Sequence, residues 1–258
     1  MRLKQAPDGR TNAVKKFQKY KGEGANPIRE VAVKENPGVI QMIGNWKKVD
    51  RVFDRLQIER IMEVFLYQKK AEEYFERMLP VANKGGGFSA REIAAFCLHK
   101  EFVDSCSSGM LQVWDTVKPA VFISALIDAS PDNEFIINVA HLPIHICNFG
   151  VRNRKQVEVI GDLGMNTGII MEGGKLVVHG NTNLHLGERM RGGNIIVKGT
   201  AESPIGGGSK GGRIDMEGGI HVNTPLPLFG KPSCKAMVYH KGRRLDRRRK
   251  TIHYIDHE

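Results

Sequence analysis

The chain of 258 residues has only four cysteines and no long apolar run. Cys97, Cys106, Cys147 and Cys234 are scattered, with no pair at C-x-x-C spacing, so the sequence favours neither a disulfide framework nor a structural zinc site. No stretch reaches the roughly 20 apolar residues that a helix needs to cross a bilayer. The N-terminal segment MRLKQAPDGRTNAVKK lacks the apolar core of a secretory signal. We therefore expect buried, reduced thiols, no membrane contact and a cytoplasmic protein.

Motifs for catalysis are also missing. The sequence contains no nucleophile elbow, and neither a Ser-His-Asp order nor a pair of carboxylates can be assigned to an active site. We therefore predict that the protein is not an enzyme and that it carries no cofactor and no metal.

Two segments allow a weaker hypothesis of a binding site. KGGGFSARE, residues 84–92, places three glycines before an expected helix start, where backbone amides could hold a phosphate, although a flexible loop before a capped helix is the simpler interpretation. His141, His145 and Cys147 follow one another at strand-like spacing and could face the same way to bind zinc. No fourth ligand is evident nearby, which favours an ordinary polar face.

Positive charge is concentrated at the two ends of the chain. The sequence has 39 Lys and Arg against 28 Asp and Glu, a net charge of +11. Residues 1–50 carry a net charge of +6 and residues 231–258 again +6, which leaves residues 51–230 near neutrality at −1. A neutral body with basic ends is typical of proteins that bind polyanions.

The amino-terminal half is predicted to be mainly helical behind a basic arm. Residues 1–50 mix glycine, proline and lysine without periodicity and are expected to be an extended arm. Apolar spacing predicts a helix over 51–79, with Asp50 as its cap and Pro80 beyond its end. Ser89 and Glu92 have the spacing of a capping box and predict a second helix. Residues 110–117 form a further helical or extended piece.

From Val121 onward the sequence is rich in β-branched and apolar residues. The segments VFISALI and FIINVAHLPIHI, separated by a turn signal at Ser130–Glu134, are predicted to be buried strands. The expected organisation is an arm over 1–50, a helical region over 51–120, a β-helix body over 121–230 and a basic tail over 231–258.

A repeat of 19 residues dominates the carboxy-terminal half. GIIMEGGKLVVHG begins at Gly168, GERMRGGNIIVKG at Gly187 and GGGSKGGRIDMEG at Gly206. Each period alternates apolar and polar residues and then turns at glycine, which predicts stacked coils that share one core. The glycines expected to build the turns are Gly161, Gly173, Gly174, Gly180, Gly192, Gly193, Gly199, Gly211, Gly212 and Gly218. We therefore predict an α+β protein in which helices precede a short right-handed parallel β-helix.

The pattern GxxMxGGxIxVxG, present at Gly187–Gly199, resembles the glycine-repeat β-helix domain found in glutamate synthase, at the end of its large chain, and in formylmethanofuran dehydrogenase. The resemblance covers about residues 150–220 and implies a non-catalytic scaffold that positions partner domains or subunits. The basic ends are not part of the family pattern. The resemblance therefore leaves open a scaffold subunit of an oxidoreductase complex as one interpretation.

The carboxy-terminal segment KGRRLDRRRK supports a different function. It holds seven cations and one acid in ten positions, and the arginine forks match phosphate geometry. His253 and Tyr254 follow and could stack on bases. We predict a non-catalytic protein that binds RNA, associates with ribosomes through rRNA and self-associates through its open coil ends. The cations expected to contact RNA are Lys15, Lys16, Lys19, Lys21, Lys241, Arg243, Arg244, Arg247, Arg248, Arg249 and Lys250.

Overall fold

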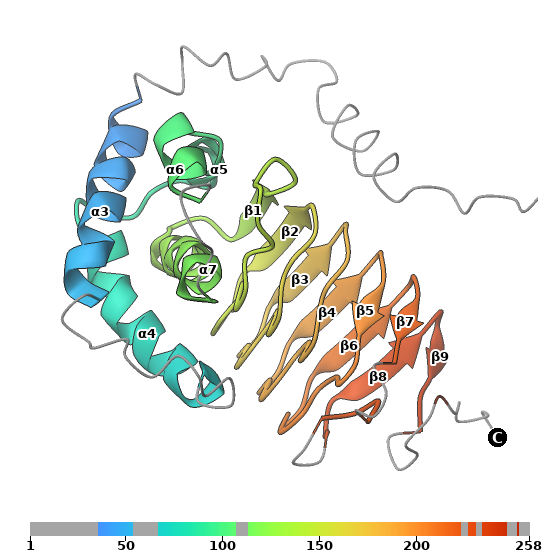
Figure 1. The fold of residues 1–258 in the computed structure, drawn as a ribbon. Helices are drawn as coiled ribbons and strands as arrows, with labels where there is room; N and C mark the ends of the chain where they lie inside the picture. The colour runs from blue at the N-terminus through green and yellow to red at the C-terminus, as the bar shows by residue number, and fades with distance from the viewer. Residues whose placement is uncertain are drawn as a thin grey trace, which may run out of the picture.

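Helices precede strands along the chain, as the α+β prediction requires (Figure 1). The computed structural model describes residues 36–53, 67–106, 113–222, 227–230, 234–246 and 252. The helices are α3 (Pro37–Phe53), α4 (Tyr67–Ala82), α5 (Ala90–Cys97), α6 (Lys100–Ser105) and α7 (Val113–Ala129). The strands are β1 (Glu134–Asn138), β2 (Gln156–Ile160), β3 (Lys175–Val178), β4 (Asn194–Val197), β5 (Ala201–Glu202), β6 (Arg213–Met216), β7 (Ile220–His221), β8 (Met237–His240) and β9 (Arg243–Arg244). No helix among the described residues is long and apolar enough to cross a membrane.

The strands wind into a right-handed parallel β-helix. One sheet has the order β1-β2-β3-β4-β6-β8-β9, in which every pair except β8 and β9 is parallel. Leu176 pairs with Ile195 and Ile195 with Ile214, each fully buried, so one apolar column runs from coil to coil. From β2 through β3 and β4 to β6, a residue and its partner in the next coil are 19 positions apart, whereas the step is 22 positions from β1 to β2 and 24 from β6 to β8. The predicted 19-residue coils are therefore confirmed.

The repeated glycines flank strands β2, β3, β4 and β6. Gly174 has φ +63°, and a Cβ there would lie 2.3 Å from the carbonyl oxygen of Lys155 in the preceding coil. A Cβ on Gly180 would lie 2.4 Å from the carbonyl oxygen of Gly161. At these two turns the coils stack so closely that backbone atoms of one coil occupy the space that a side chain on the next coil would need. Only glycine therefore fits at these positions.

A second turn repeats in a way that our sequence analysis missed. The segments NFGVR, NTGII and HLGER begin at Asn148, Asn166 and His185. In each, the first, third and fifth residues have a left-handed backbone, with φ between +53° and +78°. Asparagine and glycine tolerate this conformation best, so the recurring Asn-x-Gly or His-x-Gly was the available signal.

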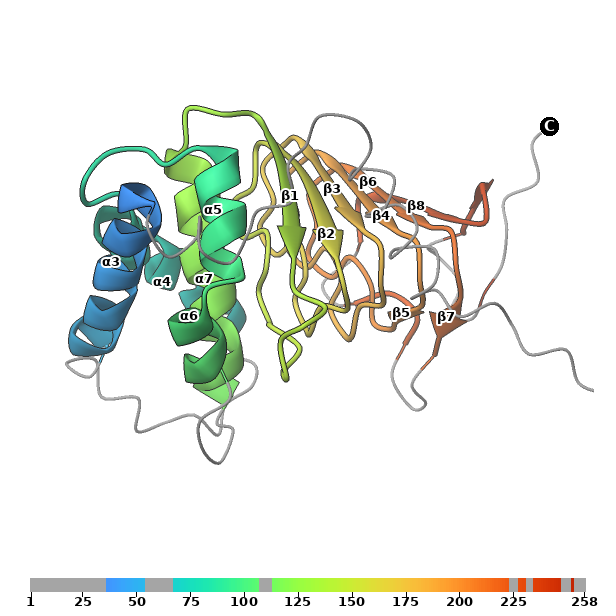
Figure 2. The same cartoon turned by 90° about the horizontal axis from the view of Figure 1, so that it is seen from above.

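Helices close the amino-terminal end of the β-helix. Helix α5 packs on β1, and α7 packs on α4 and α5 (Figure 2). At the other end β9 folds back antiparallel on β8 (Figure 1). The core is continuous from the helices into the coils, and it includes the aromatic group Trp46, Phe96, Phe102 and Phe122. The coil end at β1, which we expected to be open, is therefore covered by the chain itself.

The segment VFISALI is helical, and its predicted strand was wrong. It forms the second half of α7, where Val121, Phe122 and Ile123 are all fully buried. A helix that is buried on every side has no polar face, so its sequence shows no helical period and reads like a central strand. Of the next predicted strand, residues 135–146, only residues 135–138 are extended, within β1, and residues 141–147 form turns, bends and irregular backbone.

The predicted limits of the first helix were also wrong. Helix α3 begins at Pro37, so residues 37–50 are helical and not part of an extended arm. Asn36 caps this helix, since its Oδ1 accepts hydrogen bonds from the backbone N–H of Gly38 (2.8 Å) and Val39 (3.2 Å). The predicted helix over 51–79 includes the end of α3, residues 54–66 outside the described part, and most of α4. Pro80 lies inside α4 and not beyond it.

Two glycines in α3 give a matched test of how this helix packs against its neighbours. A Cβ on Gly44 would meet no atom of the described residues within 4 Å, so Gly44→Ala should raise the free energy of unfolding by about 0.5–1 kcal/mol through helix propensity. A Cβ on Gly38 would lie 2.1 Å from Oε1 of Glu92, so the Glu92 carboxylate would have to leave its hydrogen bonds with Ser89. Gly38→Ala should therefore lower the free energy of unfolding by about 1 kcal/mol. Urea unfolding of both variants measures these shifts, and equal shifts would contradict the packing described for α3.

Candidate nucleic-acid interface

The described part of the basic tail includes a short hairpin at the last coil. Tyr239 pairs with Arg244 and His240 with Arg243, which leaves Lys241 and Gly242 as a two-residue turn. Both turn residues have positive φ, +50° and +78°. This is the geometry of a type I′ turn, whose twist matches that of paired strands. The hairpin therefore sets the path of the backbone at the start of the cationic segment.

The structure places three of the predicted RNA-binding cations on this hairpin. Lys241 and Arg243 are exposed, and Arg244 is half-buried. The other predicted cations lie outside the described residues: Lys15, Lys16, Lys19, Lys21, Arg247, Arg248, Arg249 and Lys250. His253 and Tyr254 also lie outside them.

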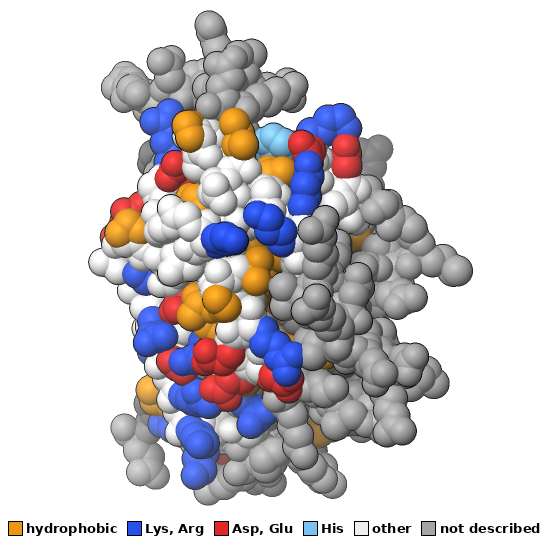
Figure 3. Space-filling model, turned by 90° about the vertical axis from the view of Figure 1, so that its left-hand side faces the viewer, with side chains coloured by type: hydrophobic (Ala, Val, Ile, Leu, Met, Phe, Trp, Pro, Cys, Tyr) orange, Lys and Arg blue, Asp and Glu red, His pale blue; other side chains and the backbone are white. Residues whose placement is uncertain are grey.

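Neighbouring coils add positive charge. Lys210 and Lys235 are exposed just before β6 and β8, at the strand ends opposite to the hairpin turn. Of the acids in this region, Asp215 binds Arg213 and Glu217 binds Lys198, while Asp246 directly follows the hairpin. The hairpin thus extends a cationic end of the β-helix, whereas Lys and Arg intermix with Asp and Glu on the face of α3 and α4 (Figure 3).

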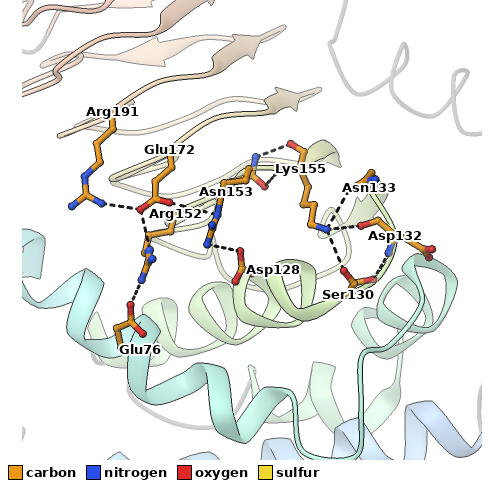
Figure 4. Close-up of polar contacts among 11 residues, drawn as sticks. Glu76, Asp128, Ser130, Asp132, Asn133, Arg152, Asn153, Lys155, Glu172 and Arg191 are labelled. Atoms are coloured by element: carbon orange, nitrogen blue, oxygen red, sulfur yellow. Dashed lines mark hydrogen bonds and ion pairs between the residues drawn. The ribbon is translucent and has the colours of Figure 1, made fainter.

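Other arginines of the β-helix are engaged in holding the helices. Glu172 accepts from Arg152 (3.1 Å) and Arg191 (2.8 Å), and it lies 3.5 Å from Arg154 (Figure 4). Arg152 also pairs with Glu76, and Arg191 with Glu72 of α4 at 3.0 Å. This network joins α4 to three successive coils. Its cations are neutralised locally, so they are poor candidates for binding a polyanion.

The glycine loop before α5 is not arranged to hold a phosphate. Ser89 and Glu92 form the predicted capping box, in which Ser89 N–H and Oγ–H donate to Oε2 of Glu92 at 2.9 and 2.7 Å. Ala90 N–H donates to Oδ2 of Asp132 at 2.7 Å. The amides at this helix start are therefore used, and two carboxylates would repel an anion.

The three residues of the zinc hypothesis do not face one another. Nε2 of His141 contacts the carbonyl oxygen of Cys97 at 2.9 Å, and His145 is exposed near Asp162. Cys147 is buried, and burial raises the pKa of its thiol. Among the described residues no group of three His, Cys, Asp or Glu side chains could hold a metal ion.

A buried carboxylate in the third coil was also missed. Glu188 is 2% exposed and occupies the position that Val151 and Ile169 hold in the preceding coils. Its Oε2 lies 3.4 Å from Nδ1 of His185, and neither atom has a hydrogen-bond partner within the described part of the chain. A Cβ on Gly207 would lie 2.5 Å from this oxygen, so the next coil leaves room for the carboxylate. The signal in the sequence was the single charge in an apolar column.

His240 makes the hairpin sensitive to acid. Burial lowers the pKa of His240, and nearby Lys241 acts in the same direction, while the hydrogen bond from Nε2 to the carbonyl oxygen of Gly218 (3.0 Å) opposes both. The unfolded chain, with a histidine pKa of about 6.5, therefore takes up a proton before the folded protein does. Stability should therefore fall as the pH drops below about 6.5, because protonating His240 costs more in the folded protein than in the unfolded chain.

The matched variant for this prediction is His240→Gln, which keeps a donor near Gly218 but cannot titrate. Urea unfolding at neutral and mildly acidic pH should show a smaller acid loss in the variant than in the wild-type protein. An equal loss in both would place the acid sensitivity at another group.

A scan against protein-family models, a search of curated proteins and a search of solved structures each give no match to this chain. The interpretation of the interface therefore rests on the geometry of the chain itself.

Proposed function

We propose that the protein binds RNA without catalysis, as a ribosome-associated protein whose β-helix is a rigid platform for its basic ends. The observation that carries the proposal is the hairpin, which presents Lys241, Arg243 and Arg244 directly before the cations of residues 247–250. A preordered start of the cationic run lowers the entropy that phosphate binding costs. Arginine supplies two parallel N–H donors to a phosphate, which suits a nucleic-acid backbone.

Sedimentation of cell lysate on sucrose gradients tests this proposal. The protein, followed by immunoblot, should travel with ribosomal particles at low salt and leave them at high salt, because each phosphate contact releases counterions. Nuclease treatment of the lysate should release it as well. Migration in a small complex that resists salt and contains no RNA would overturn the proposal.

A second candidate function rests on the coil geometry. The close stacking at Gly174 and Gly180 is what a glycine-repeat β-helix of the glutamate synthase and formylmethanofuran dehydrogenase type needs. If the repeat belongs to that family, the chain is a non-catalytic scaffold subunit of an oxidoreductase complex. Co-purification separates the candidates: flavin- or metal-bearing subunits support the scaffold, and rRNA with ribosomal proteins supports the RNA-binding protein.

A further inference from the structure

The outer face of the last two coils holds an arginine plane beside the cationic hairpin. Strands β6 and β8 are parallel neighbours, with Arg213 opposite Met237 and Asp215 opposite Tyr239. Residues 213, 215, 237 and 239 point away from the core, since the buried positions between them are Ile214, Met216 and Val238. Their side chains therefore share one surface.

Asp215 fixes the orientation of the Arg213 side chain. Nε of Arg213 donates to Oδ2 at 2.6 Å and Nη2 donates to Oδ1 at 2.8 Å, a bidentate contact that holds the guanidinium flat. The Asp215 hydrogen bond raises the pKa of Arg213, so the group stays charged. The guanidinium carbon lies 3.9 Å from the centre of the Tyr239 ring, which places cation and ring in direct contact.

This pair remains open to solvent. The Arg213 side chain is 42% exposed despite its two partners. Met237 beside it is also 42% exposed, so an apolar side chain adjoins the pair on the same surface. A flat cation backed by an aromatic ring, with an exposed thioether next to it, is a surface on which a planar, unpaired base can stack.

We propose that Arg213, stacked on Tyr239, binds a nucleobase of single-stranded RNA, while Arg244, which lies opposite Tyr239 on the same face, and Lys241 of the turn hold neighbouring phosphates. The inference rests on the RNA-binding function proposed above and names its substrate class. Bases inside a duplex are paired and stacked on one another, so only a single strand offers a free face to this plane. The contact is tolerant of sequence because every base has such a face.

A purely structural role for the pair makes a different prediction. Cross-strand cation–ring contacts also stabilise sheets, and in that case substitutions would change the free energy of unfolding without changing RNA affinity. Binding and unfolding are therefore measured on the same variants.

The test uses the full chain and a fluorescent oligouridine, alone and annealed to oligoadenosine. The wild-type protein should prefer the single strand. Arg213→Lys keeps the positive charge but removes the flat guanidinium, and Tyr239→Leu removes the aromatic ring. Each variant should bind the single strand roughly 5- to 100-fold more weakly, with little change in binding to the duplex. Tyr239→Phe should bind like the wild-type protein. Lys198→Ala, which removes a cation without a plane, is the matched control and should change binding little.

A base reporter separates stacking from charge. An oligouridine with one 2-aminopurine should lose fluorescence on binding the wild-type protein and not on binding Arg213→Lys. If the wild-type protein binds RNA with no preference for the single strand, or if Arg213→Lys and Tyr239→Leu bind normally, the stacking inference is wrong and the RNA-binding proposal stands. If the wild-type protein binds neither probe, the proposed function itself fails.

Discussion

Gly174→Ala should lower the free energy of unfolding by about 3 kcal/mol or more, the largest loss we expect from one added methyl group. Alanine at φ +63° costs about 1–2 kcal/mol on its own. The new Cβ would also lie 2.3 Å from the carbonyl oxygen of Lys155, a backbone atom fixed by the preceding coil. Overpacking of that kind adds about 1–3 kcal/mol. Thermal unfolding should show a midpoint lower by about 6–12 °C.

The neighbouring glycine is the control. Gly173 has an ordinary backbone, and a Cβ there would meet no atom of the described residues within 4 Å. Gly173→Ala should therefore unfold within about 0.5 kcal/mol of the wild-type protein, although the two glycines are adjacent and equally repeated in the sequence. If both variants unfold alike, the close stacking of coils at this turn is not what requires glycine.

The repeat could be predicted from sequence because it satisfies two independent periods. Alternation of apolar residues fixes which side of a strand is buried, and glycine at a constant spacing fixes where the chain turns. Both periods agree over Leu176, Ile195 and Ile214, so register and coil length follow without any tertiary information. The left-handed turn recurs at Asn148, Asn166 and His185, but its steps of 18 and 19 positions differ and its residue types vary, so the period is hidden.

The helical part could not be predicted as well, for a physical reason. Helix α7 lies between α4, α5 and the coils, and its residues from Ala120 to Ile123 are all buried. Such a segment has lost the polar face that reveals helical period, and only its length separates it from a strand. The capping box at Ser89 was predictable because it is local: its hydrogen bonds join residues three apart.

The candidate interface, too, could be predicted only in part from the sequence. The cations of residues 241–250 are visible in the sequence, but their platform depends on the pairing of β8 with β9 and β6. Arg213 looked like one basic residue among many in the repeat. Only the coil register brings it over Tyr239, which is 26 positions away, and no local spacing rule reports such a contact.

Neutralising the basic end should cause the largest loss of RNA affinity. For single strands the logarithm of the binding constant falls with the logarithm of salt by about 0.7 per phosphate contact. Replacing the three hairpin cations with glutamine should therefore reduce the slope by about 2, and replacing the four tail cations by about 3. At moderate salt the combined variant should bind oligouridine at least about a hundredfold more weakly. The cations replaced are Lys241, Arg243, Arg244, Arg247, Arg248, Arg249 and Lys250.

A variant of the helices controls for net charge. Lys47 of α3, Arg77 of α4 and Lys100 of α6 pair with acids on α4 and α6. Replacing these three cations with glutamine removes as much charge as the hairpin variant does. Because these cations are neutralised locally, the salt slope should stay close to that of the wild-type protein. If this control weakens binding as much as the hairpin variant, RNA responds to overall charge alone. If the hairpin variant binds normally, its arginines serve instead to protect the edge of the last strand from pairing with other chains.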